Sequence, residues 1–273
     1  MAMIYDTFLF HGECDLLEIR LNVLDKVVDK FVICEAKQSF SGEPYESLYL
    51  KNKERFKQWE DKIIYYKFNL LEDPELVKQA KESKNTSGNP YWMKVYYAME
   101  MMRKPLENCK EDDIIFISDC DEIWNPDIEI KTDGEIYGLE QIVYYYQLNN
   151  RCSEAWQGTI YTVWARLKNQ QINEYKQKGE IKLPNGGWHF TYMGGEEQVR
   201  FKVLSSRTPG EQDQTDSFYG TPTELILENA KNNRDIFAGR FNDPARAFTY
   251  TTDESQWPIY LKENREKYLH LLK

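Results

Sequence analysis

The sequence has few of the residues that would mark a zinc protein, a disulfide-bonded protein or a membrane protein. Its five cysteines are odd in number and none forms a Cys-x-x-Cys pair, so neither a thiolate zinc site nor a disulfide framework is expected. No run approaches the roughly 18 apolar residues of a membrane-spanning helix, and the N-terminus lacks the basic region of a secretion signal. We therefore expect reduced thiols, no transmembrane segment and a cytoplasmic protein.

Basic residues are fewer than acidic ones, 35 against 45. The net charge of −10 argues against a nucleic acid or an anionic membrane as a partner, because both attract basic surfaces. The acidic residues gather in one segment, since residues 107–140 hold twelve of them and only two lysines. A solvated acidic loop is one interpretation of this segment, and a binding site is the other.

Apolar residues are plentiful and their spacing predicts an α/β fold. Hydrophobic residues make up 41% and aromatic residues 14% of the 273 positions, which is enough for a sizeable core. The first half alternates strand-like and helix-like segments, the pattern of a mainly parallel sheet. No internal repeat, low-complexity tract or long linker interrupts the chain, so we expect one domain over residues 1–273 with a strand-rich second half.

The expected elements follow from apolar periodicity and turn residues. Asp15 is the expected N-cap of the first helix. Strands are predicted over residues 6–12, 30–36, 63–68, 114–124, 137–151 and 158–168, and over 184–205 as an aromatic strand that runs into a mixed segment. Helices are predicted over residues 14–28, 51–62, 90–106, 222–239 and 257–272.

The most informative stretch is "DDIIFISDCDEIW", residues 112–124. Its apolar run reads as a buried strand, and ligands of open α/β sheets collect at the carboxyl ends of such strands. In a continuing strand Asp119 and Asp121 share one face, with Cys120 turned away. Such a pair suits Mg²⁺ or Mn²⁺ with substrate phosphates in the remaining positions, although carboxylates that cap a strand end are the structural alternative.

A second group of polar residues lies in "GGWHFTYMGGEEQVRFK". His189 can be a third metal ligand or a hydrogen-bonded core histidine. The following acids include Glu197, which can abstract a proton, and the cations include Lys202, which can bind phosphate. A solvated charge run is the alternative for these last residues.

Taken in order, these strings resemble glycosyltransferase family 17. The resemblance rests on "FLFHGECDLLEIRLNVLDKVVDKFVICEAKQSFSGEP", "NKERF", "DKII", "DDIIFISDCDEIWNP" and "GGWHFTYMGGEEQVRFK", and it spans roughly residues 4–205. The family includes the enzyme that adds bisecting N-acetylglucosamine to the β-mannose of N-glycans. The resemblance implies the type A nucleotide-sugar transferase (GT-A) fold, a Rossmann-like α/β sheet, with residues 1–126 as the nucleotide-sugar half and 127–273 as the acceptor and closing half.

The resemblance also assigns residues to the donor and its metal. Asp121 matches the direct ligand of Mn²⁺ or Mg²⁺, Asp119 lies nearer the ribose and the metal's waters, and His189 matches a C-terminal ligand of the metal or the diphosphate. At the end of the second strand, Glu35 takes the position of an acid held against the uracil ring, and His11 lies beside it at the end of the first strand. Lys94 stands in the helix where many members carry an acid and an arginine.

The reaction implied is an inverting transfer from a UDP-sugar. Glu197 matches the family acid that can serve as base, and Lys202 matches a lysine suited to the leaving diphosphate. The sugar would be N-acetylglucosamine or a related hexose or pentose, and the acceptor a glycan hydroxyl. Four aromatic residues could stack on sugar rings or pack in the core: Trp92, Tyr96, Trp156 and Trp188.

Two other functions are alternatives to a transferase. A glycoside hydrolase needs its carboxylates roughly 5 to 9.5 Å apart on either side of the scissile bond, and acids at one strand end are too close together for that. A non-catalytic protein that binds a nucleotide sugar or a carbohydrate would keep the aromatic residues and would not need the base. This second alternative stays open on the sequence alone.

Overall fold

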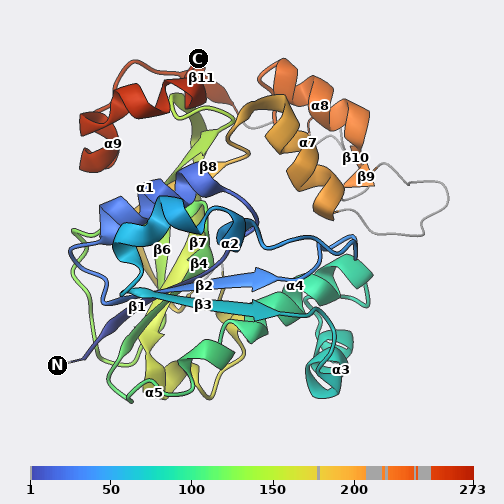
Figure 1. Cartoon of the computed structure of the whole chain (residues 1–273), viewed down its shortest axis with the longest axis vertical. Coiled ribbons are helices and arrows are strands. Elements are labelled where there is room, and N and C mark those ends of the chain that lie inside the picture. Colours follow the sequence, from blue (N-terminus) through green and yellow to red (C-terminus); the bar gives the residue numbers. More distant parts are fainter. Residues whose placement is uncertain (1, 177–178, 207–216, 219–220, 237, 239–246) are drawn as a thin grey trace.

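The first half of the chain forms four parallel strands (Figure 1). The computed structural model describes residues 2–176, 179–206, 217–218, 221–236, 238 and 247–273. β1 (Ile4–Leu9), β2 (Lys30–Ala36), β3 (Ile63–Phe68) and β4 (Ile114–Asp119) lie in the order β3-β2-β1-β4, with parallel pairing throughout. The predicted strands 30–36 and 63–68 are confirmed, and the first strand begins and ends earlier than predicted.

The central strands of this half are largely buried because helices cover both faces of the sheet, whereas the edge strand β3 is mostly half-buried. Phe116 of β4 packs in one apolar cluster with α1 (Cys14–Leu24), and Ile115 packs in the other with α4 (Pro90–Met101). Continuous apolar runs are the expected pattern for strands buried on both faces. This explains why the run before Asp119 reads so clearly in the sequence.

The second half continues the same sheet with mixed pairing. β4 pairs antiparallel with β7 (Asn150–Val163), and the order then runs through β6 (Tyr137–Tyr145) and β8 (Ile181–Thr191) to the short β5 (Glu122–Trp124). β6 and β8 are parallel, whereas β5 and β8 are antiparallel. The described residues form one nine-stranded sheet, so the prediction of a mainly parallel sheet holds only for the first half.

Several predicted elements of the second half are divided in the structure. The strand predicted over 137–151 contains the whole of β6 and the start of β7, and the strand over 158–168 ends in α5 (Trp164–Leu167). The segment 184–205 is β8 followed by α7 (Gly195–Ser206). The helix predicted over 222–239 is α8 (Thr223–Lys231), and positions 237 and 239 of that prediction lie outside the described residues.

The remaining helices are shorter than predicted or were not predicted. The helix predicted over 14–28 is α1, and Glu13 rather than Asp15 precedes it. Asp15 instead accepts hydrogen bonds from Arg55 and from the His270 ring. The helix predicted over 51–62 corresponds to η1 (Lys53–Trp59), preceded by the short α2 (Leu48–Lys51), and the helix predicted over 257–272 is divided into α9 (Ile259–Glu263) and η3 (Arg265–Leu271). A short η2 (Lys104–Leu106) follows α4. Two helices were not predicted, α3 (Pro74–Glu82) and α6 (Ile172–Tyr175).

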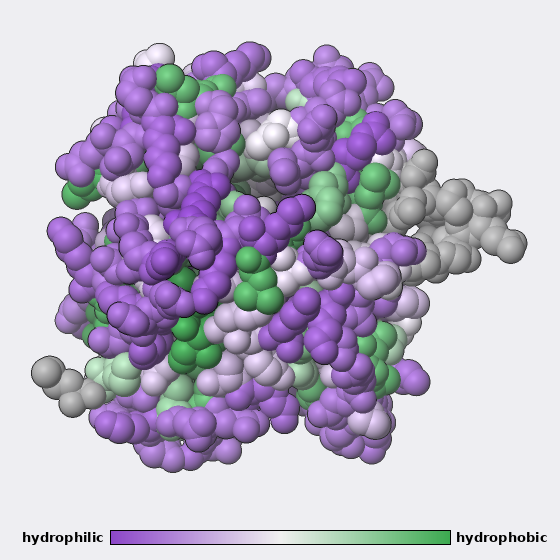
Figure 2. All heavy atoms as spheres, in the orientation of Figure 1, coloured by the Kyte–Doolittle hydropathy of each residue, from purple (hydrophilic) through white to green (hydrophobic). Residues whose placement is uncertain are grey.

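The remaining strands are short, and the visible surface is mainly polar. β11 (Phe248–Tyr250) pairs with β7, while β9 (Ser217–Phe218) and β10 (Thr221–Pro222) pair with each other. The face shown in Figure 2 is mainly hydrophilic, with apolar residues in small separate groups. Among the described residues, no helix is both long enough and apolar enough to cross a membrane.

Candidate functional site

The candidate site lies where the order of the sheet changes direction. β2 and β3 lie on one side of β1 and β4 lies on the other, so the carboxyl ends of β1 and β4 flank a topological switch point, where α/β proteins bind ligands. A cavity of about 530 Å³ is found there. Its wall includes His11 after β1, Asp119 at the end of β4, and Lys202 of α7. This volume is within the usual range for small-molecule sites.

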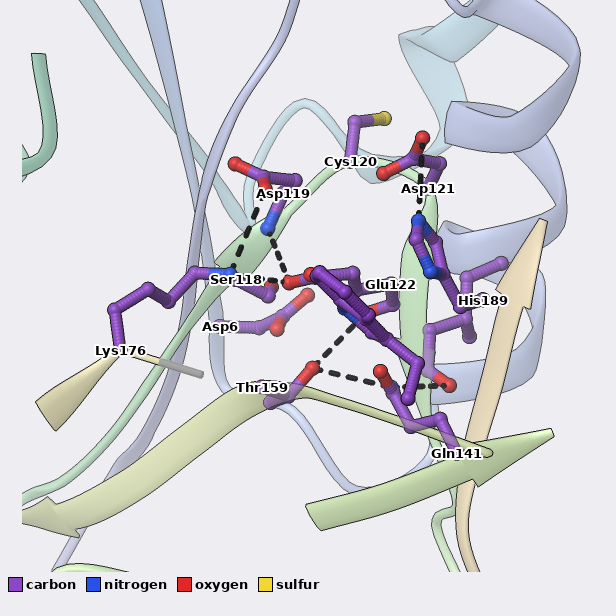
Figure 3. Close-up of polar contacts among 12 residues, drawn as sticks. Asp6, Ser118, Asp119, Cys120, Asp121, Glu122, Gln141, Thr159, Lys176 and His189 are labelled. Atoms are coloured by element: carbon purple, nitrogen blue, oxygen red, sulfur yellow. Dashed lines mark hydrogen bonds and ion pairs between the residues drawn. The ribbon is translucent and has the colours of Figure 1, made fainter. Parts of the chain in front are cut away.

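Residues 119–122, here called the acid turn, do not form a continuous strand. β4 ends at Asp119, the chain turns at Cys120 and Asp121, and β5 begins at Glu122 and pairs with β8 instead of continuing β4. The prediction that Asp119 and Asp121 share a strand face is therefore wrong. Figure 3 shows the Asp119 side chain toward Lys176 and the Asp121 side chain toward His189.

Asp121 faces two basic side chains that come from the second half of the chain. Its Oδ2 lies 2.8 Å from the Lys202 Nζ of α7 and 3.7 Å from the His189 Nε2 of β8. Burial alone would raise the pKa of the Asp121 carboxyl, but Lys202 and His189 outweigh burial and hold this pKa well below its usual range. Asp121, Lys202 and His189, all selected from the sequence, are thus brought together.

Asp119 and Glu122 share a lysine that sequence reasoning missed. The Lys176 Nζ, just after α6, lies 2.6 Å from Glu122 Oε2 and 3.5 Å from Asp119 Oδ2. Trp156 Nε1 donates to the other Glu122 oxygen at 2.7 Å. Burial raises the pKa of Asp119, whereas at Glu122 the pull of Lys176 and His189 outweighs burial and lowers the pKa. Lys176 stands in "INEYKQKGE", a stretch with no motif that could have revealed it.

The wall beside β1 carries His11 and Glu13. His11 Nε2 lies 2.7 Å from the Ser205 hydroxyl of α7, and its ring stacks on Phe201 with centroids 5.3 Å apart. Burial, with a further contribution from Lys202, lowers the pKa of His11 to about 4, so its imidazole is neutral near pH 7. Burial also raises the pKa of Glu13, whose Oε1 lies 3.9 Å from Lys202 Nζ.

Glu35 and Lys94 lie away from the cavity wall in the described part of the chain. Glu35 is fully buried, and its carboxylate accepts hydrogen bonds from the Ser47 hydroxyl at 2.6 Å, the Leu48 amide at 2.7 Å and the Tyr65 hydroxyl at 2.7 Å. Lys94 donates to the backbone carbonyl of Phe40. In this structure both side chains support the loop that follows β2.

Glu197 lies on the exposed surface of the first turn of α7 and is not part of the described cavity wall. Lys202 lies five residues further along the same helix, which rotates it roughly 140° away from Glu197. The two family-matched residues therefore face different surroundings. Of the four aromatic candidates, Trp92 and Trp156 line the cavity, whereas Tyr96 and Trp188 are buried, with 2% and 9% of their surfaces exposed.

The fit of a divalent metal can be tested on the side chains present. No three His, Cys, Asp or Glu side chains converge as a metal site within the described ranges, because Asp119 faces Lys176 on the other side of the acid turn. Asp121 Oδ2 and His189 Nε2 do face each other at 3.7 Å, within the roughly 3 to 4 Å that separates two ligands of one Mg²⁺ or Mn²⁺. Such ions often take only one or two protein ligands and complete their coordination with phosphates and water.

A cavity lined by charged side chains at the switch point of the sheet is the arrangement in which α/β proteins bind their ligands. The chain belongs to glycosyltransferase family 17, whose family model matches residues 1–204. This confirms the resemblance seen in the sequence and supports a glycosyl transfer activity, with a sugar donor and a glycan acceptor as its partners. A search of curated proteins gave no match.

Proposed function

We propose that the protein is a metal-dependent, inverting glycosyltransferase of the GT-A type that moves a sugar from a UDP-sugar to a glycan hydroxyl. The observation that carries the proposal is the charge of the cavity. Its described wall contains five carboxylates, those of Glu13, Glu154 and the acid turn, against Lys202 in the wall and Lys176 paired with Glu122 and Asp119. A nucleoside diphosphate would be repelled by this wall unless a divalent cation offset the negative charge.

Asp121 and His189 are the residues proposed to hold Mn²⁺ or Mg²⁺. The ion would supply neutralisation of the charge that develops on the diphosphate as it leaves. Lys202, held beside Asp121, is placed to add a second positive charge to that leaving group. The transferred sugar would be N-acetylglucosamine or a related hexose or pentose, and Asp119 would face the ribose or waters of the metal.

The first test is calorimetric titration of UDP, GDP and CMP into the protein, with Mn²⁺ and again with EDTA. We expect UDP alone to bind tightly, and only with Mn²⁺. Asp121→Asn should weaken this binding by about 100-fold, since it removes a charged ligand. Asp127→Asn is the matched control, because Asp127 is an exposed acid in the loop after β5. Binding of UDP that is equally tight in EDTA would refute the metal dependence, and no nucleotide binding would refute the donor.

The base is proposed to be a carboxylate of the cavity wall. Glu154 and Trp156, two residues apart on β7, both line the cavity. We therefore expect Glu154→Gln to retain UDP affinity and to lose about 10²- to 10⁴-fold in turnover. Glu197→Gln provides the comparison, and we expect its turnover to stay within about twofold of the parent. The reverse result would assign the base to Glu197, as the family resemblance implies.

A further inference from the structure

We infer that Arg20 and Asp6 are positioning residues that hold the acid turn in the orientation the donor site needs. Arg20 lies in α1 and Asp6 in β1, and both side chains are fully buried. Neither residue lines the described cavity wall, and neither is part of the metal or phosphate chemistry proposed above. The inference rests on the proposed function, because the turn they hold presents Asp121.

The guanidinium of Arg20 connects α1 to the acid turn through several hydrogen bonds. Its Nη1 donates to the backbone carbonyls of Asp119 at 3.1 Å, Cys120 at 3.4 Å and Glu122 at 2.8 Å. Its Nη2 also donates to the hydroxyl of Ser118. One side chain therefore contacts the backbone at three of the four positions of the turn.

Asp6 orients the guanidinium from the opposite side. Its two carboxylate oxygens accept from Arg20 Nε at 2.7 Å and Nη2 at 2.6 Å, a planar two-point contact that fixes the direction of the remaining N–H groups. Trp124 Nε1 of β5 donates to the same carboxylate at 3.0 Å, and the Phe8 ring lies 4.3 Å from the guanidinium carbon. The pair is thus held by β1, α1 and β5 together.

These contacts matter because the chain leaves β4 after Asp119 and pairs with β8 only from Glu122 onward. The carbonyl of Asp121 accepts from the Phe190 amide of β8 at 2.9 Å, and the carbonyl of Glu122 accepts from the Thr159 hydroxyl at 3.3 Å as well as from Arg20. Arg20 is the side chain that donates to the carbonyls of Asp119 and Cys120. A buried carbonyl without a donor is unfavourable, so the turn depends on this side chain for its shape. That shape directs Asp119 toward Lys176 and Asp121 toward Lys202 and His189.

An arginine is needed for this arrangement. The guanidinium presents five N–H donors in a rigid plane, whereas a lysine ammonium is a compact charge with three donors on a flexible stem. Arg20→Lys therefore keeps the charge beside Asp6 but cannot also span the carbonyls of the turn. Arg103→Lys is the matched control, because Arg103 pairs with the largely buried Glu100 outside the cavity wall.

The experiment combines a measurement without ligand and one with ligand on the full chain. Hydrogen exchange followed by mass spectrometry should show at least tenfold faster exchange over residues 118–124 in Arg20→Lys, with less change elsewhere. Calorimetry with UDP and Mn²⁺ should show at least tenfold weaker binding. Arg103→Lys should show neither effect. If Arg20→Lys does not fold, Asp6→Asn, which keeps the arginine but loses its charged anchor, should show the same two effects in smaller size.

Three results would overturn the inference. Exchange that rises evenly over the whole chain would mean that Arg20 only stabilises the fold. Unchanged exchange over 118–124 would mean that the turn keeps its shape without the guanidinium. Faster exchange there with unchanged UDP affinity would mean that the donor site does not need that shape. If the parent protein binds no UDP, the proposed function fails, while the exchange measurement still shows whether Arg20 holds the turn.

Discussion

Lys176 provides the positive charge that allows Glu122 to remain ionised with 1% of its side chain exposed. Lys176→Met would leave a buried carboxylate without its partner, which typically costs about 3 to 5 kcal/mol. We expect a loss of about 3 kcal/mol in the free energy of unfolding measured with urea at pH 7. Lys168→Met removes the lysine of a pair with the exposed Glu111 and should cost less than about 1 kcal/mol.

The pH dependence of this loss has a definite sign. The pKa of Glu122 is lowered in the folded protein, so its ion pair contributes stability above the pKa of an unfolded glutamate, and this contribution disappears as the pH falls. The difference between the parent and Lys176→Met should therefore be largest near pH 7 and should shrink toward pH 4. A difference that stays constant over this range would contradict an electrostatic role for Lys176.

Residues of the candidate site could be predicted only where they stand in a recognisable local sequence pattern. Asp119 and Asp121 follow an apolar run, and His189 and Lys202 lie in a glycine-flanked aromatic stretch, so the sequence drew attention to each. Arg20 lies in the middle of α1 and Lys176 just after α6, and their importance comes from contacts with Glu122, 102 and 54 positions away along the chain. Such long-range partners have no signature in a single sequence.

At the scale of elements, the pairing of β5 with β8 depends on a glycine. Gly187 has φ +130°, and a Cβ atom there would lie 2.2 Å from the carbonyl oxygen of Ile123. Gly187→Ala should separate the two strands that place Glu122 opposite His189, with an expected cost of about 2 to 4 kcal/mol in unfolding free energy.

Gly134→Ala is the matched control for this substitution. Gly134 also has a positive φ, +86°, but a Cβ atom there would meet no other atom within 4 Å. It should cost only about 1 kcal/mol, the strain of the backbone conformation. Equal losses in the two variants, measured by thermal unfolding, would show that the close approach of β5 and β8 carries no extra cost.

Element boundaries were predicted well where one period of apolar residues ran without a break. β2 and β3 match their predicted ranges: β2 is a largely buried apolar run, and β3 is a half-buried run of apolar and aromatic residues at the edge of the sheet. The boundary between β6 and β7 was missed because the aromatic run over 144–146 hides the turn that follows. The direction change from β4 to β5 was missed because the tertiary pairing of Glu122 with His189, and not a local turn residue, ends the strand.

At the scale of the whole molecule, the core extends beyond the segment that the family model matches. Leu271 of η3 has 2% of its surface exposed and packs in the same apolar cluster as α1, whereas Leu269 in the same short helix is 46% exposed. Leu271→Ala should cost about 2 to 4 kcal/mol and Leu269→Ala less than about 0.5 kcal/mol. Chemical denaturation of both variants checks this, and similar losses would mean that η3 does not seal the core.

The α/β class of the fold could be predicted from the sequence, whereas the strand order of the second half of the chain could not. The alternation of strands and helices up to Asp119 predicts an α/β sheet, as found. The mixed pairing of β6, β7 and β8 depends on which strand edges meet in space, and hydrophobic periodicity does not specify strand order or direction. The location of the cavity could still be predicted, because it lies at the carboxyl ends of the first-half strands.

The order in which the site's charges are synthesised follows from their positions along the chain. Asp6 and Arg20 precede the acid turn, so they are available as soon as residue 122 leaves the ribosome. Lys176, His189 and Lys202 come later, and Lys202 follows Asp121 by 81 residues. The carboxylates must therefore stay hydrated until the second half emerges, which makes the candidate site among the last parts of the molecule to mature. A nascent chain that stopped before Lys202 would carry the acid turn without the lysine beside Asp121.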